Sequence, residues 1–322
     1  MCRAIIMMSY IFHVIKKMKF KHYRIIFNNY LIIIKYMAYK SDFQKVVEFN
    51  HQFGVHLHTS PKFDIFTTEP NNVEFCLKLI REEIRELNDA LHTKDYIETI
   101  DALADIIYVV MGMSARLGTD MDEVFPIIMK TIVSRDNSTI IETWFDNNPN
   151  KSYTFTGMTD NDMPTNFEQV LEYYHDFNET KHMTFKYMEN GKLIMATLDC
   201  INNCLKKLEK YATTEKNYVK TIKYLGYILY YSYDMSALLE TNMDKAFNIV
   251  HKNNMSKLCS TEADAKESVS WYLSQKDKLG YESPTYRLAP DGIHWVVYNE
   301  STKKILKSIK WKPVDLTILY KQ

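Results

Sequence analysis

Residues 79–108 read LIREEIRELNDALHTKDYIETIDALADIIY. The apolar residues recur with helical spacing on both sides of a short polar turn at residues 92–95, which predicts two consecutive helices. Three glutamates of the first helix lie on one side, opposite much of its apolar set, and these are Glu82, Glu83 and Glu86. The stretch therefore predicts a helical hairpin with an acidic face.

The second helix carries an acidic stripe of its own, because Glu98, Asp101 and Asp105 are spaced three and four residues apart. The rest of this helix is apolar nearly all round, which predicts that it is buried. Burying a carboxylate is costly unless it is paired or binds a metal, and oxygen ligands suit hard divalent cations. The pattern predicts a metal site. For the glutamates beside Arg81 and Arg85, a solvated face is the alternative.

Composition limits the class of protein. A length of 322 residues allows one large domain or two ordinary ones. With only eight Gly and eight Pro, the chain favours long helices over many turns. A formal net charge of zero argues against nucleic acid as a partner, because phosphate binding usually requires a basic excess. The five cysteines lack the paired spacing of a zinc site and suit a reducing compartment, so a cytoplasmic location is expected.

The first 36 residues differ from the rest, since they are apolar and basic and contain no acid. Lysines and an arginine interrupt every apolar run before it reaches the length of a membrane span. Two interpretations remain: a basic helix on a membrane surface, or upstream sequence before a true start at Met37. We expect residues 1–36 not to belong to the fold, and a membrane partner is not expected.

The chain contains an internal echo. VVEFNHQF at 46–53 resembles VLEYYHDF at 170–177, at an offset of 124. MSARLGTDMDEVF at 113–125 resembles MSALLETNMDKAF at 235–247, at an offset of 122. Such self-similarity suggests a duplication. We divide the chain into a first repeat (37–137), a linker (138–166), a second repeat (167–260) and a C-terminal helix with a β-hairpin (261–322).

Local signals place several element ends. Ser41 and Asp42 can cap a helix that stops near Gly54, and Gly118 is expected to end the second acidic helix. In the C-terminal part, residues 261–279 are expected to be helical. The β-like runs HWVVYN (294–299) and KILKSI (304–309) are expected to pair as a hairpin.

The residues also carry a family resemblance. Glu82-Glu83-x-x-Glu86, followed by Asp101-Ala-Leu-Ala-Asp105, resembles the acidic motif of the all-α nucleoside triphosphate pyrophosphohydrolases, the superfamily of MazG, dimeric dUTPases and phosphoribosyl-ATP pyrophosphohydrolase. The runs EFNHQFG (48–54), VHKNNMSK (250–257) and KILKSIKWKPVDL (304–316) resemble the phosphoribosyl-ATP pyrophosphohydrolase-like branch. The resemblance implies an all-α fold of two helical repeats packed as a pseudo-dimer, with the small β-hairpin as an appendage.

The resemblance also implies an activity. Members cleave a nucleoside triphosphate to the monophosphate and pyrophosphate, with Mg²⁺ or Mn²⁺ held by the acidic helices. It implies catalytic roles for Glu82, Glu83 and Glu86. It implies metal ligation by Glu83, Glu86, Asp101 and Asp105. It implies substrate binding by Asn254 and Lys257, with Glu98 and His251 as further candidates.

One departure leaves the exact ligands open. The family usually places a glutamate three residues before the second-helix aspartate, but Ala102 occupies that position before Asp105. Glu98-x-x-Asp101 offers the same spacing one turn earlier. The direct ligands among Glu98, Asp101 and Asp105 therefore stay undecided.

The two repeats have lost complementary motifs. At offset 122, the acids of the first repeat correspond to non-acidic residues of the second, namely Cys204, Leu205, Leu208, Lys220, Lys223 and Tyr227. Conversely, at an offset of 121, Asn254 and Lys257 correspond to Val133 and Asp136. We therefore expect one composite site, in which Lys257 reaches the phosphates bound at the acids of the first repeat. A further homo-oligomer is left open.

Two other functions compete with the enzyme: a non-catalytic nucleotide-binding protein, and a helical partner-binding protein anchored by its leader. The histidines His51, His56 and His58 lack a matching cysteine or histidine cluster, so no zinc site is predicted. The lysines of residues 303–312 are interpreted as a solvated hairpin face.

Overall fold

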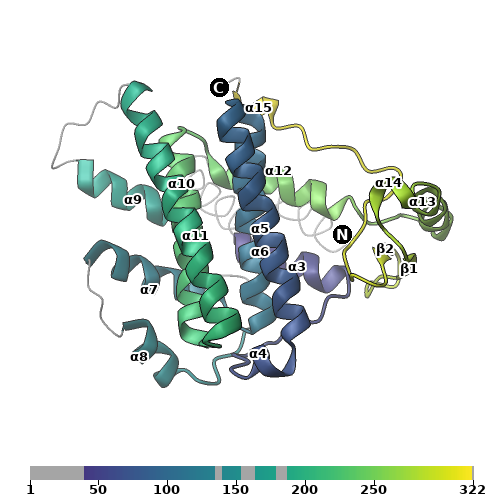
Figure 1. The fold of residues 1–322 in the computed structure, drawn as a ribbon, viewed down its shortest axis with the longest axis horizontal. Coiled ribbons are helices and arrows are strands. Elements are labelled where there is room, and N and C mark those ends of the chain that lie inside the picture. The colour runs from purple at the N-terminus through teal and green to yellow at the C-terminus, as the bar shows by residue number, and fades with distance from the viewer. Residues whose placement is uncertain (1–39, 135–139, 154–163, 179–186, 321–322) are drawn as a thin grey trace, which may run out of the picture. The chain divides into compact units, whose positions relative to one another are not determined.

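The computed structural model describes residues 40–134, 140–153, 164–178 and 187–320. One compact body, Ser41–Gly157 with Pro164–Gln322, contains the described helices and strands (Figure 1). The expectations for residues 1–36 and for a start at Met37 lie outside the described residues. Within the described ranges, no helix is both long enough and apolar enough to cross a membrane.

The first repeat contributes five helices: α3 (Asp42–Gln52), α4 (Ile65–Thr68), α5 (Pro70–Thr93), α6 (Tyr96–Leu117) and α7 (Met121–Ser134). Their ends follow the sequence signals. The Ser41 hydroxyl accepts a hydrogen bond from the Gln44 amide and caps α3, and Gly118, with φ of 84°, ends α6. Helix α5 begins earlier than the acidic stretch, because Pro70 stands in its first turn, where its missing N–H costs nothing.

The second repeat has the same order of long helices: α9 (Asn166–Asn178), α10 (Tyr187–Glu209), α11 (Tyr218–Leu238) and α12 (Met243–Met255). Helix α10 continues into a π-helical turn, Lys210–Thr214. The segment interpreted as a linker also holds a helix, α8 (Ile140–Asn147), whose Ile141 and Phe145 are buried in the main core. Part of that segment therefore belongs to the packed body.

The two repeats contact each other through a reciprocal pair of hydrogen bonds. Tyr96, at the start of α6, shares one with Thr241 after α11 (2.5 Å between oxygens). Tyr218, at the start of α11, shares one with Thr119 after α6 (2.7 Å). The two tyrosines are 122 positions apart in the sequence, and so are the two threonines. This relation supports a pseudo-twofold arrangement of two similar repeats.

A second equivalence lies inside each repeat. The Ser41 hydroxyl donates a hydrogen bond to Asp122 near the start of α7. The Thr165 hydroxyl donates one to Asp244 at the start of α12 (2.9 Å). In both repeats the residue that precedes the first helix is thus tied to the last one, as a duplication would produce.

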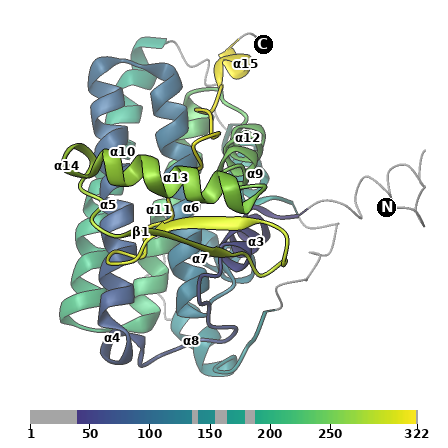
Figure 2. The same ribbon diagram turned by 90° about the vertical axis from the view of Figure 1, so that its right-hand side faces the viewer.

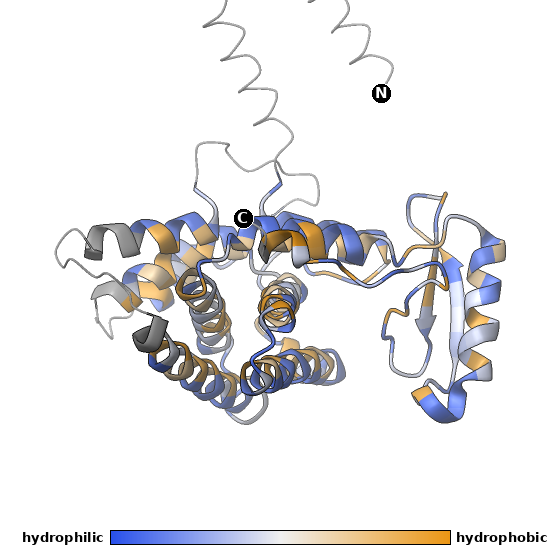
Figure 3. Cartoon of the chain, turned by 90° about the horizontal axis from the view of Figure 1, so that it is seen from above, coloured by the Kyte–Doolittle hydropathy of each residue, from blue (hydrophilic) through white to orange (hydrophobic). Residues whose placement is uncertain are grey.

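Helix α6 lies at the centre of the packing. It contacts α5, α11, α3 and α12, while α10 pairs with α11. Figure 3 looks along the long helices and shows their hydrophobic sides facing one another. The apolar residues of α6, such as Leu103, Ile106 and Ile107, are fully buried. Asp101 and Asp105, which are half-buried on the same helix, therefore lie next to the core.

The C-terminal part contains α13 (Glu262–Ser274), α14 (Lys276–Leu279), strands β1 (Pro284–Leu288) and β2 (Trp295–Asn299), and α15 (Thr317–Tyr320). The expected helix at 261–279 and the small antiparallel hairpin are confirmed, and Figure 2 shows α13 lying along the hairpin. The expected pairing is present only in part, because β2 forms its ladder with β1, while residues 304–309 contribute only one isolated bridge to β2.

The reason is a competition for backbone hydrogen bonds. Residues 304–306 do turn back on β2, with a single bridge between Tyr298 and Ile305. Beyond Leu306 the chain is captured by α13, since the Tyr272 hydroxyl bonds both backbone groups of Lys307 and the Ser268 hydroxyl accepts from the Ile309 amide. These groups cannot also extend a strand ladder.

The reciprocal contact between repeats can be tested at Tyr218. Its buried hydroxyl bonds Thr119 and the Leu117 carbonyl (2.6 Å), so Tyr218→Phe removes both bonds and takes this partner from the buried Thr119 hydroxyl. We expect a loss of about 1–3 kcal/mol in the free energy of unfolding, measured by urea denaturation. Tyr224→Phe, on the same helix but without a hydroxyl partner in the described chain, is the matched control. Equal stability of the two variants would contradict the role given to the contact.

Candidate active site

The acids of the sequence motif meet across the α5–α6 hairpin. Asp95 caps α6 by accepting from the Glu98 amide, and Lys94 takes a left-handed conformation that allows the tight turn. The antiparallel pair brings Glu82, Glu83 and Glu86 of α5 opposite Glu98, Asp101 and Asp105 of α6. We call these six residues the acidic cluster.

Burial and mutual repulsion perturb this cluster strongly. Burial first, and then the charges of Asp105, Glu86 and Glu82, raise the pKa of Glu83 to about 9. Burial followed by its acidic neighbours raises the pKa of Asp101 to about 7. Burial also raises the pKa of Glu86. The cluster is thus an electrostatic site that favours the uptake of positive charge.

Three lysines from distant segments face this negative charge. Lys257 follows α12, whereas Lys304 and Lys307 follow β2. The Lys304 ammonium lies 3.5 Å from a carboxylate oxygen of Glu82. Burial raises the pKa of Asp105 to about 6, against the attraction of Lys257 and Lys307. Burial lowers the pKa of Lys257, against the attraction of Asp105 and Glu83.

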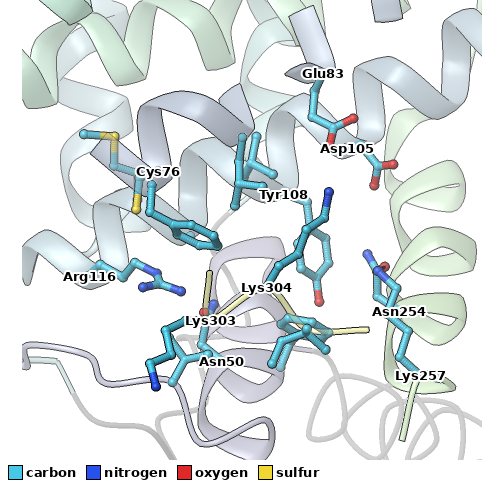
Figure 4. Close-up of a pocket in the computed structure, with 18 residues that line it drawn as sticks. Asn50, Cys76, Glu83, Asp105, Tyr108, Arg116, Asn254, Lys257, Lys303 and Lys304 are labelled. Atoms are coloured by element: carbon cyan, nitrogen blue, oxygen red, sulfur yellow. Dashed lines mark hydrogen bonds between the residues drawn. The ribbon is translucent and has the colours of Figure 1, made fainter. Parts of the chain in front are cut away.

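A cavity of about 180 Å³ adjoins the cluster (Figure 4). Glu83 and Asp105 lie at one end of it, with Asn254 and Lys257 beside them. Lys257 donates a hydrogen bond to the Asn254 side-chain oxygen (2.6 Å), which fixes the pair. Four of the expected residues, Glu83, Asp105, Asn254 and Lys257, therefore line one cavity, and their roles stay predictions. The other acids of the cluster, Glu82, Glu86, Glu98 and Asp101, do not line it.

The rest of the cavity is largely apolar. Its walls include Phe49 of α3, Phe75 of α5 and Tyr108 of α6, and Gly112 leaves one wall without a side chain. The Arg116 guanidinium lies over the Phe75 ring, 5.3 Å from its centroid, at a distance from the acids (Figure 4). A cavity with an apolar body and cations at its ends fits a flat, anionic ligand.

His251 does not line the cavity but lies behind Tyr108. Its Nδ1 is 3.1 Å from the Tyr108 hydroxyl, and the two rings stack with centroids 6.1 Å apart. Its Nε2 lies 3.7 Å from Glu48. The geometry gives His251 contact with a wall of the cavity rather than with the acids.

Several site residues were missed by sequence reasoning. Lys303 and Lys304 line the cavity, a placement that the interpretation of this segment as a solvated face did not include. Lys303 is nevertheless exposed and pairs with Glu300, whereas Lys304 is half-buried beside Glu82. That interpretation holds better for Lys310, which pairs with Asp264 (2.6 Å). The signal was the KILKSIKWKPVDL resemblance, which covered this segment. Arg116 and Gly112 had no such signal, because only the fold turns that face of α6 toward α3.

The second repeat has no equivalent acidic site at the corresponding positions. Cys204 and Leu208 are buried where the first repeat has Glu82 and Glu86. Lys223 lies over the Tyr227 ring, 5.8 Å from its centroid. Apolar and aromatic packing thus replaces charge there, which leaves one acidic cluster among the corresponding positions.

The comparisons with known proteins agree with this geometry. The family model of phosphoribosyl-ATP pyrophosphohydrolase matches residues 46–131, which span α3 to α7 and include the whole acidic cluster. The chain is 30% identical over 274 residues to the uncharacterized protein L479 of Acanthamoeba polyphaga mimivirus, a match that covers 84% of this chain and 92% of that protein. No solved structure matches. The chain therefore belongs to one family with the mimivirus protein, and its residues 46–131 assign it to the all-α, MazG-like superfamily of pyrophosphohydrolases.

Proposed function

We propose that the protein is a divalent-metal-dependent hydrolase that cleaves a nucleoside triphosphate to the monophosphate and pyrophosphate. One observation carries the proposal: Glu83 and Asp105 of the acidic cluster and the Asn254–Lys257 pair of the second repeat line the same cavity. Acids for a cation and an ammonium for a phosphate are the two halves of a triphosphate site.

The acidic cluster fits a hard cation by its chemistry. Its carboxylates raise one another's pKa because negative charge is crowded and partly buried, and a cation would relieve this repulsion. Glu83, Glu86, Asp101 and Asp105 would hold Mg²⁺ or Mn²⁺. Within the described residues, no three of these acids yet bring ligand atoms within 4.8 Å of one another, so binding would draw them together. When bound, the ion supplies neutralisation of phosphate charge.

The residues of the chain account for the remaining steps. Lys257, held by Asn254, would pair with phosphate oxygens as negative charge moves onto the leaving pyrophosphate. A water oxygen bonds to phosphorus, the bond from phosphorus to the bridging oxygen breaks, and a carboxylate accepts the proton of the water. Among Glu82, Glu83 and Glu86, we assign this last role to Glu83, because it lines the cavity and the other two do not.

The nucleoside would occupy the apolar part of the cavity. Phe49, Phe75 and Tyr108 offer ring surfaces for a base, and Arg116 offers N–H donors at the far end. The cavity is open toward Lys303 and Lys304, which would accompany the outer phosphates. This placement assigns the whole length of the cavity to one nucleotide.

The acids are the first test. We expect Glu83→Gln, Glu86→Gln and Asp105→Asn each to reduce turnover by about 10²–10⁴-fold, since each removes a charge from the reacting end. The measurement is pyrophosphate release from a panel of nucleoside triphosphates, with and without Mg²⁺. Glu74→Gln on α5 is the matched control, because Glu74 is exposed and pairs only weakly with Arg81 at 3.6 Å.

The pH dependence of stability provides a second test of Glu83. A pKa of about 9 for folded Glu83, against 4.5 ordinarily, means that the folded protein holds a proton that the unfolded chain releases. The metal-free protein should therefore lose stability as pH rises through that window, and Glu83→Gln should lose less.

Near-normal turnover in any two of the three acid variants would overturn the assignment.

Lys257 tests the composite nature of the site. Removing its ammonium from the phosphates should lower turnover by about 10²-fold or more, so Lys257→Ala should be nearly inactive. Lys223→Ala is the control, because Lys223 lies in the second repeat over Tyr227, away from the cavity lining. If both variants kept full activity, the second repeat would not contribute to the site.

Gly112 tests the placement of the nucleoside. A Cβ here would meet only Val46 and Asn50, at 3.8 and 3.9 Å, so alanine fits and should stabilise α6 by about 0.5–1 kcal/mol. A Gly112→Leu side chain should instead project into the cavity and raise KM. Gly191→Ala on α10, where a Cβ meets nothing within 4 Å, should stabilise similarly with unchanged kinetics. Unchanged KM in Gly112→Leu would move the nucleoside out of this cavity.

A further inference from the structure

The segment between α3 and α4 presents two histidines side by side. Hydrogen bonds tie the segment down on both sides: the Val55 amide donates to the Asn50 carbonyl (2.8 Å), and the Lys62 amide donates to the Leu117 carbonyl (3.0 Å). Leu57, the residue between the two histidines, is buried. In extended chain, neighbours on either side of a buried residue share the opposite face. The rings of His56 and His58 accordingly lie with centroids 4.8 Å apart.

A carboxylate from the start of α5 completes this group. Glu69 stands at the N-cap of α5, where Ser, Thr, Asp or Asn is preferred, and its side chain makes no capping hydrogen bond. Instead one of its carboxylate oxygens lies 2.7 Å from the His58 Nε2. One ligand atom from each of His56, His58 and Glu69 falls within 4.8 Å of the others. The sequence analysis had lacked this third residue.

An outer hydrogen-bond chain orients the carboxylate. The other Glu69 oxygen accepts from the Asn72 side chain (3.0 Å), and the Asn72 oxygen accepts from Arg116 (2.6 Å). Carboxylates that ligate metals are usually held by such outer partners. Here the chain of contacts ends at Arg116, which lines the candidate nucleotide cavity.

We propose that His56, His58 and Glu69 form a second metal site, for a divalent transition metal of the zinc class. Two imidazole nitrogens and one carboxylate oxygen are ligands that zinc accepts, with the fourth position open to water. The acidic cluster differs, because its oxygen-only ligands suit Mg²⁺. Glu69 and Glu83 are 14 residues apart in sequence, which corresponds to about 21 Å along the axis of α5. The two sites therefore do not share ligands.

The site would act as a clamp. It joins the segment after α3 to the start of α5, and through Asn72 it would fix Arg116 at the far end of the cavity. The proposal does not depend on the pyrophosphohydrolase assignment. An ion pair between His58 and Glu69, with His56 as a simple surface residue, is the competing account.

The test is direct metal binding to the full-length chain after removal of bound metal. Zn²⁺ titration calorimetry in excess Mg²⁺, and Co²⁺ absorption, should show one site per chain that His56→Ala and His58→Ala each remove. Asn72→Ala should weaken it by about 10–100-fold, as expected for an outer partner. Zn²⁺ should also raise the melting temperature of the unchanged protein but not of His58→Ala.

Two controls separate this site from the others. Glu83→Gln should keep the Co²⁺ spectrum, because its residue belongs to the acidic cluster. His294→Ala should also keep it, although His294 has a similar pair with Asp291 at 2.6 Å. Equal Zn²⁺ affinity in His58→Ala and the unchanged protein, or loss of the spectrum in Glu83→Gln, would overturn the proposal. Either result leaves the turnover test of the proposed function unaffected.

Discussion

Negative charge on α6, a helix of the central packing, is the constraint on which the rest of the structure depends. Helix α6 packs against α3, α5, α7, α11 and α12, yet it carries Asp101 and Asp105 beside fully buried apolar residues. Burial and mutual repulsion raise the pKa of both carboxyls, so the fold spends stability to hold them there. Such a cost is typical of a site built for a cation and a reaction rather than for packing.

The compensating positive charge comes from elsewhere in the chain. Lys257 belongs to the second repeat and Lys304 to the C-terminal segment, and both reach the acids of the first repeat. The reciprocal contacts of Tyr96 with Thr241 and of Tyr218 with Thr119 set how the repeats meet. Once the repeats are joined this way, one acidic cluster and one Asn254–Lys257 pair suffice for a single site. The second repeat can then keep Cys204 and Leu208 as core.

The two candidate metal sites differ in their ligand chemistry. The acidic cluster offers only carboxylate oxygens, whereas the group at His56, His58 and Glu69 offers nitrogen and oxygen. The link from Glu69 through Asn72 to Arg116 places the second group in contact with the cavity wall. Helix α5 thus begins at Glu69 of the histidine group and carries the three glutamates of the acidic cluster farther along. It is therefore a rigid connection between the two sites.

Periodicity, caps and spacing were enough to predict the acidic hairpin of α5 and α6 and the end at Gly118, because these depend on residues close in the chain. The family was predicted from the resemblance of short motifs. The contacts that assemble the cavity were not predictable in this way. Arg116 and Gly112 face it only because α6 packs on α3, and β2 pairs with β1 because α13 captures the segment after Leu306. Glu69 joins the two histidines only through the path of the loop. Tertiary packing decides these contacts, because distant segments compete for the same hydrogen bonds and charges. The local sequence does not show which of the competing contacts forms.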